Sequence, residues 1–264
     1  MPSRFTIHLS SIALLALLAA LPAQASATDN ATAPLDPPAL EWNQGQPLRA
    51  FEGAYRAFYR GKPAGDATLA LKQLGSNRWE VSLDVRGNRG VVSVLGLNLY
   101  QSTEFEVIGN NQFRPLTQRT VRKGLFLGKR LEGRYDWSRH QARWSGDLDK
   151  KRQLPVPLQD GDLSALLINL ALIRDASPSR QLEYRFADAG RARLHRYQFA
   201  DATAPITVEE LSYDALRAWR TNTSTGNAME LWVANGVPTP VRISQHEEGQ
   251  PGLDLHLIEY KEVE

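Results

Sequence analysis

The residues that could do chemistry in this sequence do not form a recognised catalytic or metal-binding pattern. Four histidines follow the N-terminal apolar segment, and none of them belongs to a ligand spacing such as His-Glu-x-x-His. The pairs Asp147-x-Asp149 and Asp160-x-Asp162 lack the rest of a calcium loop, so we interpret them as turn and helix-capping residues. Nucleophile-elbow, Ser-x-x-Lys, phosphate-loop and dinucleotide motifs are absent. The sequence therefore predicts no metal site, no cofactor and no nameable catalytic residue.

Composition narrows the class of protein further. The 264 residues include no cysteine, which excludes disulfides, thiolate nucleophiles and cysteine-ligated metals. A formal net charge of +2 does not indicate a nucleic-acid partner. The six tryptophans could stack on sugars, but Trp79 lies on an apolar strand face, and we expect most of the others to be core residues as well.

The first 25 residues have the pattern of a cleavable secretory signal. Arg4 precedes ten unbroken apolar residues, Ile12 to Leu21, which are too few to span a bilayer. The small-residue pattern Ala23-Gln24-Ala25 follows, so we expect cleavage after Ala25 and export to a Gram-negative periplasm. Residues 26–44 are rich in proline and small residues, which predicts a disordered linker. Residues 45–264 then form a single β-rich domain.

Two-residue alternation dominates from Phe51 onward and predicts a mainly β fold. In Arg78 to Arg86, apolar residues occupy every second position and polar residues occupy the others, as in a strand with one buried face. Short turns between such segments predict antiparallel pairing. We expect further strands at Phe51–Tyr59, Ala67–Leu74, Leu99–Ile108, Leu131–Trp137, Gln141–Trp144, Leu182–Phe186, Leu194–Phe199, Ile206–Tyr213, Met229–Val233, Val241–Gln245 and Leu253–Tyr260.

One segment, Asp162 to Arg174, breaks this alternation and predicts a helix. Asp160 or Asp162 is the expected N-cap. The helix is apolar nearly all round, so it must be buried on most sides. We expect it to lie in the concave face of a strongly curved antiparallel sheet or an incomplete barrel. Its apolar stripe is the candidate lining of a cleft for an acyl chain, with ligand-binding residues Leu166, Leu167, Leu170 and Ile173.

Charge is distributed unevenly along the chain. Between Gln112 and Arg152 there are twelve Lys or Arg residues against four Asp or Glu residues, whereas acidic residues predominate from Ser244 to Glu264. A basic exported surface can meet anionic lipid headgroups. The alternative is that arginines merely occupy the solvated face of strands.

Apolar residues sit between glycines and cations inside the basic stretch. If this segment is an exposed hairpin tip, it predicts membrane contact. If it is a buried strand, it does not. The candidate membrane-contact residues are Lys123, Leu125, Phe126, Leu127, Lys129 and Arg130.

A series of short motifs in a characteristic order resembles the exported bacterial family known as domain of unknown function 3108. The motifs span residues 45 to 263 and include Phe51-x-x-x-Tyr55, the turn at Gly65, Tyr135-Asp136-Trp137, Leu154-Pro155, Gln159-Asp160 with Leu163-Ser164, Leu231-Trp232 and Pro240-Val241. Gly161-Asp162 departs from the family pattern. The resemblance implies a β-rich periplasmic domain and no established activity, so it supplies no catalytic residues.

The expected architecture is also similar to the lipoprotein carriers of the Gram-negative envelope, which are half-open β-barrels with helices in the concavity. Fold alone does not determine function. We expect a non-enzymatic periplasmic protein that binds a hydrophobic or amphipathic ligand, or a partner at the membrane. The expected partners are a lipid, an anionic membrane surface or an envelope protein. A periplasmic hydrolase or glycan-acting enzyme with a site assembled from separate strands, and a structural module of an envelope complex, are the alternatives.

Overall fold

The structure is a computed structural model, and it describes residues 47–90, 96, 98–109, 111–124, 128–221, 228–247 and 250–263. The predicted signal peptide and linker lie outside these residues and stay predictions. No helix among the described residues has both the length and the apolar character needed to span a membrane.

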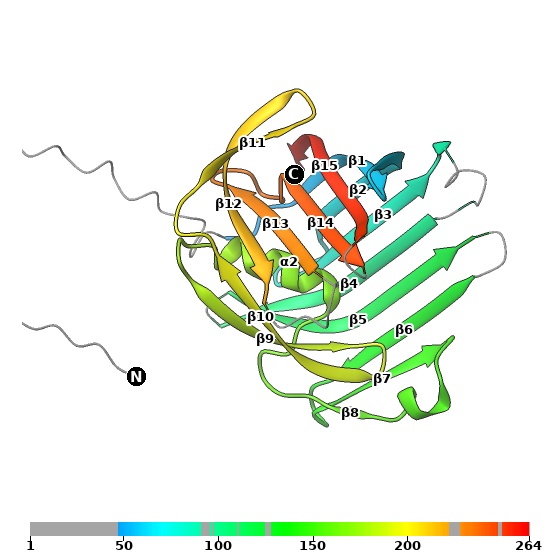
Figure 1. The fold of residues 1–264 in the computed structure, drawn as a ribbon. Coiled ribbons are helices and arrows are strands. Elements are labelled where there is room, and N and C mark those ends of the chain that lie inside the picture. The colour runs from blue at the N-terminus through cyan, green and yellow to red at the C-terminus, as the bar shows by residue number, and fades with distance from the viewer. Residues whose placement is uncertain are drawn as a thin grey trace, which may run out of the picture. The chain divides into compact units, whose positions relative to one another are not determined.

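Antiparallel strands make up most of the described chain, as the alternation predicted (Figure 1). The strands are β1 (Phe51–Tyr59), β2 (Lys62–Gln73), β3 (Arg78–Gly87), β4 (Asn98–Ile108), β5 (Gln112–Lys123), β6 (Lys129–Asp136), β7 (Gln141–Gly146), β8 (Val156–Pro157), β9 (Gln181–Asp188), β10 (Arg191–Phe199), β11 (Ala204–Val208), β12 (Leu211–Arg220), β13 (Ala228–Ala234), β14 (Arg242–Glu247) and β15 (Gln250–Glu262). A short 3₁₀ helix, η1 (Lys150–Arg152), precedes β8, and one α-helix, α2 (Ala165–Arg174), follows it.

All of the strands belong to one sheet, which curves into a nearly closed barrel. Its order is β8-β7-β6-β5-β4-β3-β2-β1-β15-β14-β13-β12-β10-β9, with β11 paired to β12. The first and last strands are neighbours, because β1 pairs with β15 from Phe51 opposite Glu262 to Tyr59 opposite Leu253. The two edges of the sheet are therefore β8 and β9, and the unsealed seam lies between them.

Burial follows the predicted alternation. In β3, Trp79, Val81 and Leu83 are buried, and the residues between them are half-buried. Burying a large apolar side chain stabilises the fold by about 1.5–3 kcal/mol, so this face sets the register of the strand.

Helix α2 fills the concave face of the sheet, as predicted (Figure 1). Every residue from Leu166 to Ile173 is buried, because strands β3, β4, β5 and β9 contact the helix on different sides. A helix that is apolar all round is stable only in such a position.

The helix begins later than the sequence suggested, so the predicted N-cap was wrong. The N-cap is Ser164, whose hydroxyl lies 2.8 Å from that of Thr103. Asp162 instead accepts hydrogen bonds from the Gln159 N–H and from Arg185. The physical reason lies at Leu163, whose backbone bonds Arg185 and Ala187 of β9 and is thereby held extended.

The seam between β8 and β9 is bridged by side chains and by the backbone of Leu163, which bonds β9. The Tyr135 hydroxyl donates to the Ala187 carbonyl at 2.7 Å, and the Gln118 amide donates to Asp188. A second, small core lies beneath the seam, formed by Tyr135, Ala142, Trp144, Val156, Leu158 and Ala187. Side-chain packing thus holds together two edges that no continuous ladder joins.

The segment predicted as one strand, Ile206–Tyr213, is two strands. A turn at Glu209 and Glu210 separates β11 from β12, and Glu209 has a positive φ of 52°. Both glutamates are exposed, whereas Val208 just before them is buried. The two successive glutamates interrupt the alternation, because Val208 and Leu211 are three residues apart, and the prediction of one strand overlooked this signal.

Candidate functional site

Two separate pockets flank α2 and divide the predicted ligand-binding residues between them. Leu170 and Ile173 line a pocket of about 140 Å³ at the C-terminal end of the helix, which we call the Arg174 pocket. Leu166 lines a pocket of about 130 Å³ toward the N-terminal end, which we call the His195 pocket. Leu167 is fully buried and lines neither pocket. The concave face is therefore mostly filled by the helix.

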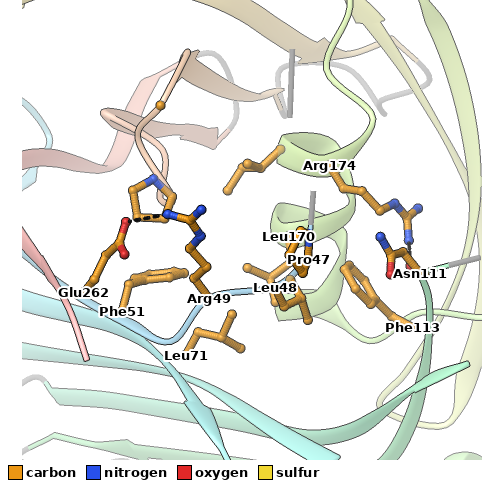
Figure 2. A pocket seen from close by; sticks show the side chains of 13 residues that line it. Pro47, Leu48, Arg49, Phe51, Leu71, Asn111, Phe113, Leu170, Arg174 and Glu262 are labelled. Carbon is orange, nitrogen blue, oxygen red and sulfur yellow. Dashed lines mark hydrogen bonds and ion pairs between the residues drawn. The ribbon is translucent and has the colours of Figure 1, made fainter. Parts of the chain in front are cut away.

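The Arg174 pocket has an apolar floor and a polar rim (Figure 2). Strand β1 contributes Phe51, β2 contributes Leu71 and β5 contributes Phe113, and all three face inward by strand alternation. Figure 2 shows Arg49 and Glu262 on one side of the pocket and Arg174 on the other. Such a site can bury the apolar part of a ligand and place the ligand's polar group at the charged rim.

Arg174 is held firmly and its charge is already neutralised. Its Nε and Nη2 donate to the Asp175 carboxylate at 2.9 and 2.6 Å, its Nη1 donates to the Asn111 carbonyl at 2.6 Å, and its guanidinium lies 4.6 Å from the Phe113 ring centroid. Burial opposes both charged forms, but the contact with Asp175 raises the pKa of Arg174. The bonds from Arg174 and Tyr184 lower the pKa of Asp175. Both groups therefore stay ionised, and their role is to hold this side of the pocket in place.

Arg49 is the more exchangeable cation of this pocket. Its Nη1 lies 3.6 Å from a Glu262 carboxylate oxygen, and both side chains are more than half exposed. Exposed ion pairs of this kind contribute about 0–1 kcal/mol. An anionic group of a ligand can therefore replace Glu262 at little cost.

A larger pocket of about 490 Å³ adjoins the Arg174 pocket. The two share Leu48, Arg49, Phe51 and Glu262 as lining residues. Leu48 and Arg49 belong to an irregular segment before β1, whose Ala50 carbonyl accepts a hydrogen bond from the Val263 N–H at 3.0 Å. The two spaces therefore lie beside the same segment.

Three of the predicted membrane-contact residues lie at the paired ends of β5 and β6. Lys123 ends β5, while Lys129 and Arg130 begin β6, and all three are exposed. Leu125, Phe126 and Leu127 lie outside the described residues. The outer face of β5, β6 and β7 adds exposed Arg119, Arg134 and Arg143, for which the described residues supply no ion pair.

The described indoles are not exposed stacking platforms for sugars. Trp79 and Trp144 are buried. Arginine guanidiniums cover rings of the other three at 4.9–5.9 Å from the ring centroids: Trp137 by Arg114, Trp219 by Arg217, and Trp232 by Arg217 and Arg242. Within the described ranges, no three His, Asp or Glu side chains are grouped to hold a metal ion.

Sequence reasoning assigned no role to the polar residues of the His195 pocket. His195, Tyr197 and Phe199 are buried at alternate positions of β10, so strand alternation does predict that His195 faces inward. Asn169 and Arg220 join it from α2 and β12. Their convergence needed the tertiary structure, because three distant segments supply them.

Comparisons with known proteins name no activity, and one solved structure supports the barrel-like fold. The structure is similar to a crystal structure of a beta-barrel-like protein of domain of unknown function DUF1849 from Brucella abortus, with a TM-score of 0.50 and 8% identity over 82% of this chain and 99% of that one. A DUF1089 family protein from Pseudomonas aeruginosa matches with a TM-score of 0.36 and 14% identity, over 68% of this chain and 89% of that one. No curated protein matches the chain.

The family model for "Protein of unknown function (DUF3108)" matches residues 54–250, which is most of the chain. The match runs from β1 to the start of β15 and includes α2, whereas Arg49, Phe51 and Glu262 of the Arg174 pocket lie outside it. This chain therefore belongs to the DUF3108 family.

Proposed function

We propose that this protein is a non-enzymatic periplasmic protein of the cell envelope that binds an anionic amphipathic ligand at the Arg174 pocket. The observation that carries the proposal is an apolar pocket with an exchangeable arginine at its rim. Export rests on the signal-like segment that ends at Ala25. The ligand would place its apolar end against α2 and its anionic head beside Arg49.

The size of the pocket sets the size of the buried group. A cavity of about 150 Å³ lined by Leu, Ile and Phe accepts benzene. The Arg174 pocket, at about 140 Å³ with a lining of the same kind, suits a ring or the end of an alkyl chain. The adjoining space of about 490 Å³ would take the remainder of a longer ligand.

The chemistry of the rim supports binding rather than catalysis. Arg174 and Asp175 bond each other through two hydrogen bonds, and the lowered pKa of Asp175 makes it a poor base at neutral pH. Arginine does not exchange protons in this range. These groups can orient an anion and are poorly suited to proton transfer.

Ligand binding can be tested with a pair of probes that share one tail, octanoate and 1-octanol. We expect octanoate to bind more tightly than 1-octanol. Arg49→Ala should weaken octanoate binding about tenfold and leave 1-octanol binding unchanged, because a charge-assisted contact contributes about 1.5 kcal/mol. Isothermal titration calorimetry measures all four affinities.

Arg89→Ala is the matched control, because Arg89 also forms a weak exposed ion pair, at 3.8 Å from Asp66. Equal losses in both variants would remove Arg49 from the site. Native mass spectrometry of gently purified protein is the second measurement. A clean apo mass together with no binding of either probe would overturn the proposed function.

A second candidate function is contact with an anionic membrane surface, and the specific observation that favours it is the basic hairpin of β5 and β6. Lys123, Lys129 and Arg130 project there beside the basic outer face of β5 to β7. Near an anionic surface each cation contributes about 1 kcal/mol. The apolar residues Leu125, Phe126 and Leu127 of the same segment would insert among the acyl chains.

Flotation with vesicles of phosphatidylcholine and phosphatidylglycerol tests this contact. We expect Lys129→Glu with Arg130→Glu to reduce vesicle binding at least tenfold, since about 2 kcal/mol of attraction is lost. The control reverses two exposed cations of η1, Lys150→Glu with Lys151→Glu, and should bind as the wild type does. Equal binding by the wild type and the hairpin variant would remove the hairpin from any membrane contact.

A further inference from the structure

The His195 pocket is a separate space inside the barrel. It shares no lining residue with the Arg174 pocket. Its volume of about 130 Å³ is close to that of the apolar cavity that holds a benzene molecule. Its apolar walls come from α2 and several strands and include Leu83, Leu166, Phe186 and Ile243. The walls therefore suit one ring-sized apolar body.

Two buried polar side chains of this pocket lack partners for one atom each. Asn169 and His195 are each 7% exposed, and both line the pocket. The Asn169 Oδ1 and the His195 Nδ1 have no hydrogen-bond partner among the described residues. A buried polar atom without a partner costs free energy, and native proteins rarely retain such atoms without a use. A ligand with its own polar groups would satisfy both.

The charged residue in the described lining of the pocket is an arginine. Arg220 lines it together with Gln101 and Gln245, and the described lining includes no aspartate or glutamate. Burial, together with the charges of Arg220 and Arg193, lowers the pKa of His195 to about 4, so its imidazole is neutral at pH 7. Arg220 keeps its proton there, although burial lowers its pKa. The pocket therefore presents a cation and a neutral imidazole to whatever enters it.

We infer that the His195 pocket binds a small carboxylic acid that carries a ring-sized apolar body and a hydroxyl group. The carboxylate would lie beside Arg220, and the His195 Nδ1–H tautomer would donate to it. The hydroxyl would donate to the Asn169 Oδ1. The ring would pack between Leu166 and Phe186, whose ring already stacks on His195 with 4.7 Å between centroids. Each polar atom of the ligand thus meets a group that lacks a partner or carries the opposite charge.

This site is independent of the proposed function, because the two pockets have different residues. 4-Hydroxybenzoate is the probe, and it has two matched analogues. Benzoate lacks the hydroxyl, and 4-hydroxybenzyl alcohol lacks the charge. Calorimetry on the full mature chain should show that 4-hydroxybenzoate binds about tenfold more tightly than either analogue.

Two variants test which side chain recognises the carboxylate and which recognises the hydroxyl of the ligand. Arg220→Met should abolish the preference for 4-hydroxybenzoate over 4-hydroxybenzyl alcohol, and Asn169→Leu should abolish the preference over benzoate. Asn169→Leu should also raise the melting temperature of the ligand-free protein, because it replaces an amide whose buried oxygen has no partner with an apolar group of similar size. Arg49→Ala, in the other pocket, is the control and should change none of these affinities.

The wild-type probe series alone can overturn the inference if either variant fails to fold. No binding of 4-hydroxybenzoate at millimolar concentration would overturn the inference. Equal affinities for the three probes would show that neither the cation nor the amide recognises a ligand. Loss of octanoate binding with retention of 4-hydroxybenzoate binding would leave this inference standing and reject the proposed function.

Discussion

Replacing Leu167 with alanine is expected to lower the free energy of unfolding by about 3–5 kcal/mol. Leu167 is fully buried in the first turn of α2 and borders neither pocket, so no existing space lets the structure relax around the deletion. The loss combines the transfer free energy of the removed methyl groups with the cost of a new cavity. Urea denaturation measures the loss, and the melting temperature should fall by about 10 °C.

Leu154→Ala is the control for this prediction. Leu154 is 64% exposed between η1 and β8, so its truncation should change the free energy of unfolding by less than about 0.5 kcal/mol. Similar losses for the two variants would mean that α2 is not the centre of the core. The comparison uses one type of substitution and differs in burial alone.

Gly190→Ala is the second large effect we expect, because this glycine lies at the seam. It occupies the turn between β9 and β10 with a φ of +74°, and an added Cβ would lie 1.9 Å from the Arg152 carbonyl oxygen. Left-handed backbone costs a non-glycine residue about 1–2 kcal/mol. The collision adds to this cost, since backbone on both sides must move. We expect a total loss of about 3 kcal/mol or more.

Gly61→Ala separates the two causes. Gly61 has nearly the same φ, +72°, and no atom lies within 4 Å of a Cβ placed there. It should therefore show the backbone cost without the collision. Hydrogen exchange gives the local reading: the Ala187 amide, which bonds the Leu163 carbonyl at 2.9 Å across the seam, should exchange faster in Gly190→Ala than in Gly61→Ala. Equal losses of stability would mean that the contact with Arg152 does not hold the seam.

Alternation was a sufficient guide to most strands. Successive side chains of a strand point to opposite faces of the sheet. The inward-facing residues of β3 and β10 are therefore Trp79 and Tyr197 and the residues at every second position from them. Alternation is interrupted at Glu209 and Glu210, where the chain turns, and the prediction of one continuous strand overlooked that interruption. Alternation could not place the N-cap of α2, since the position of that cap depends on the bridge from Leu163 to a strand that lies later in the chain.

The candidate site was predicted in part. Leu166, Leu170 and Ile173 line pockets as the apolar stripe suggested, whereas Leu167 is enclosed by neighbours on every side. The partners of these residues come from strands on both sides of the seam. Arg49 and Glu262 meet because β1 pairs with β15. The sequence around either residue does not predict this pairing.

The amino-acid pattern alone determined a mainly β chain with one apolar helix that had to be buried. The periodicity of apolar side chains, which indicates both, is a local property of each segment. The closure of the sheet, the bridge across β8 and β9, and the two pockets were decided by tertiary structure. Each of them depends on how closely side chains from distant segments fit together. Small mismatches in that fit, at the two ends of α2, left the spaces in which we place the ligands.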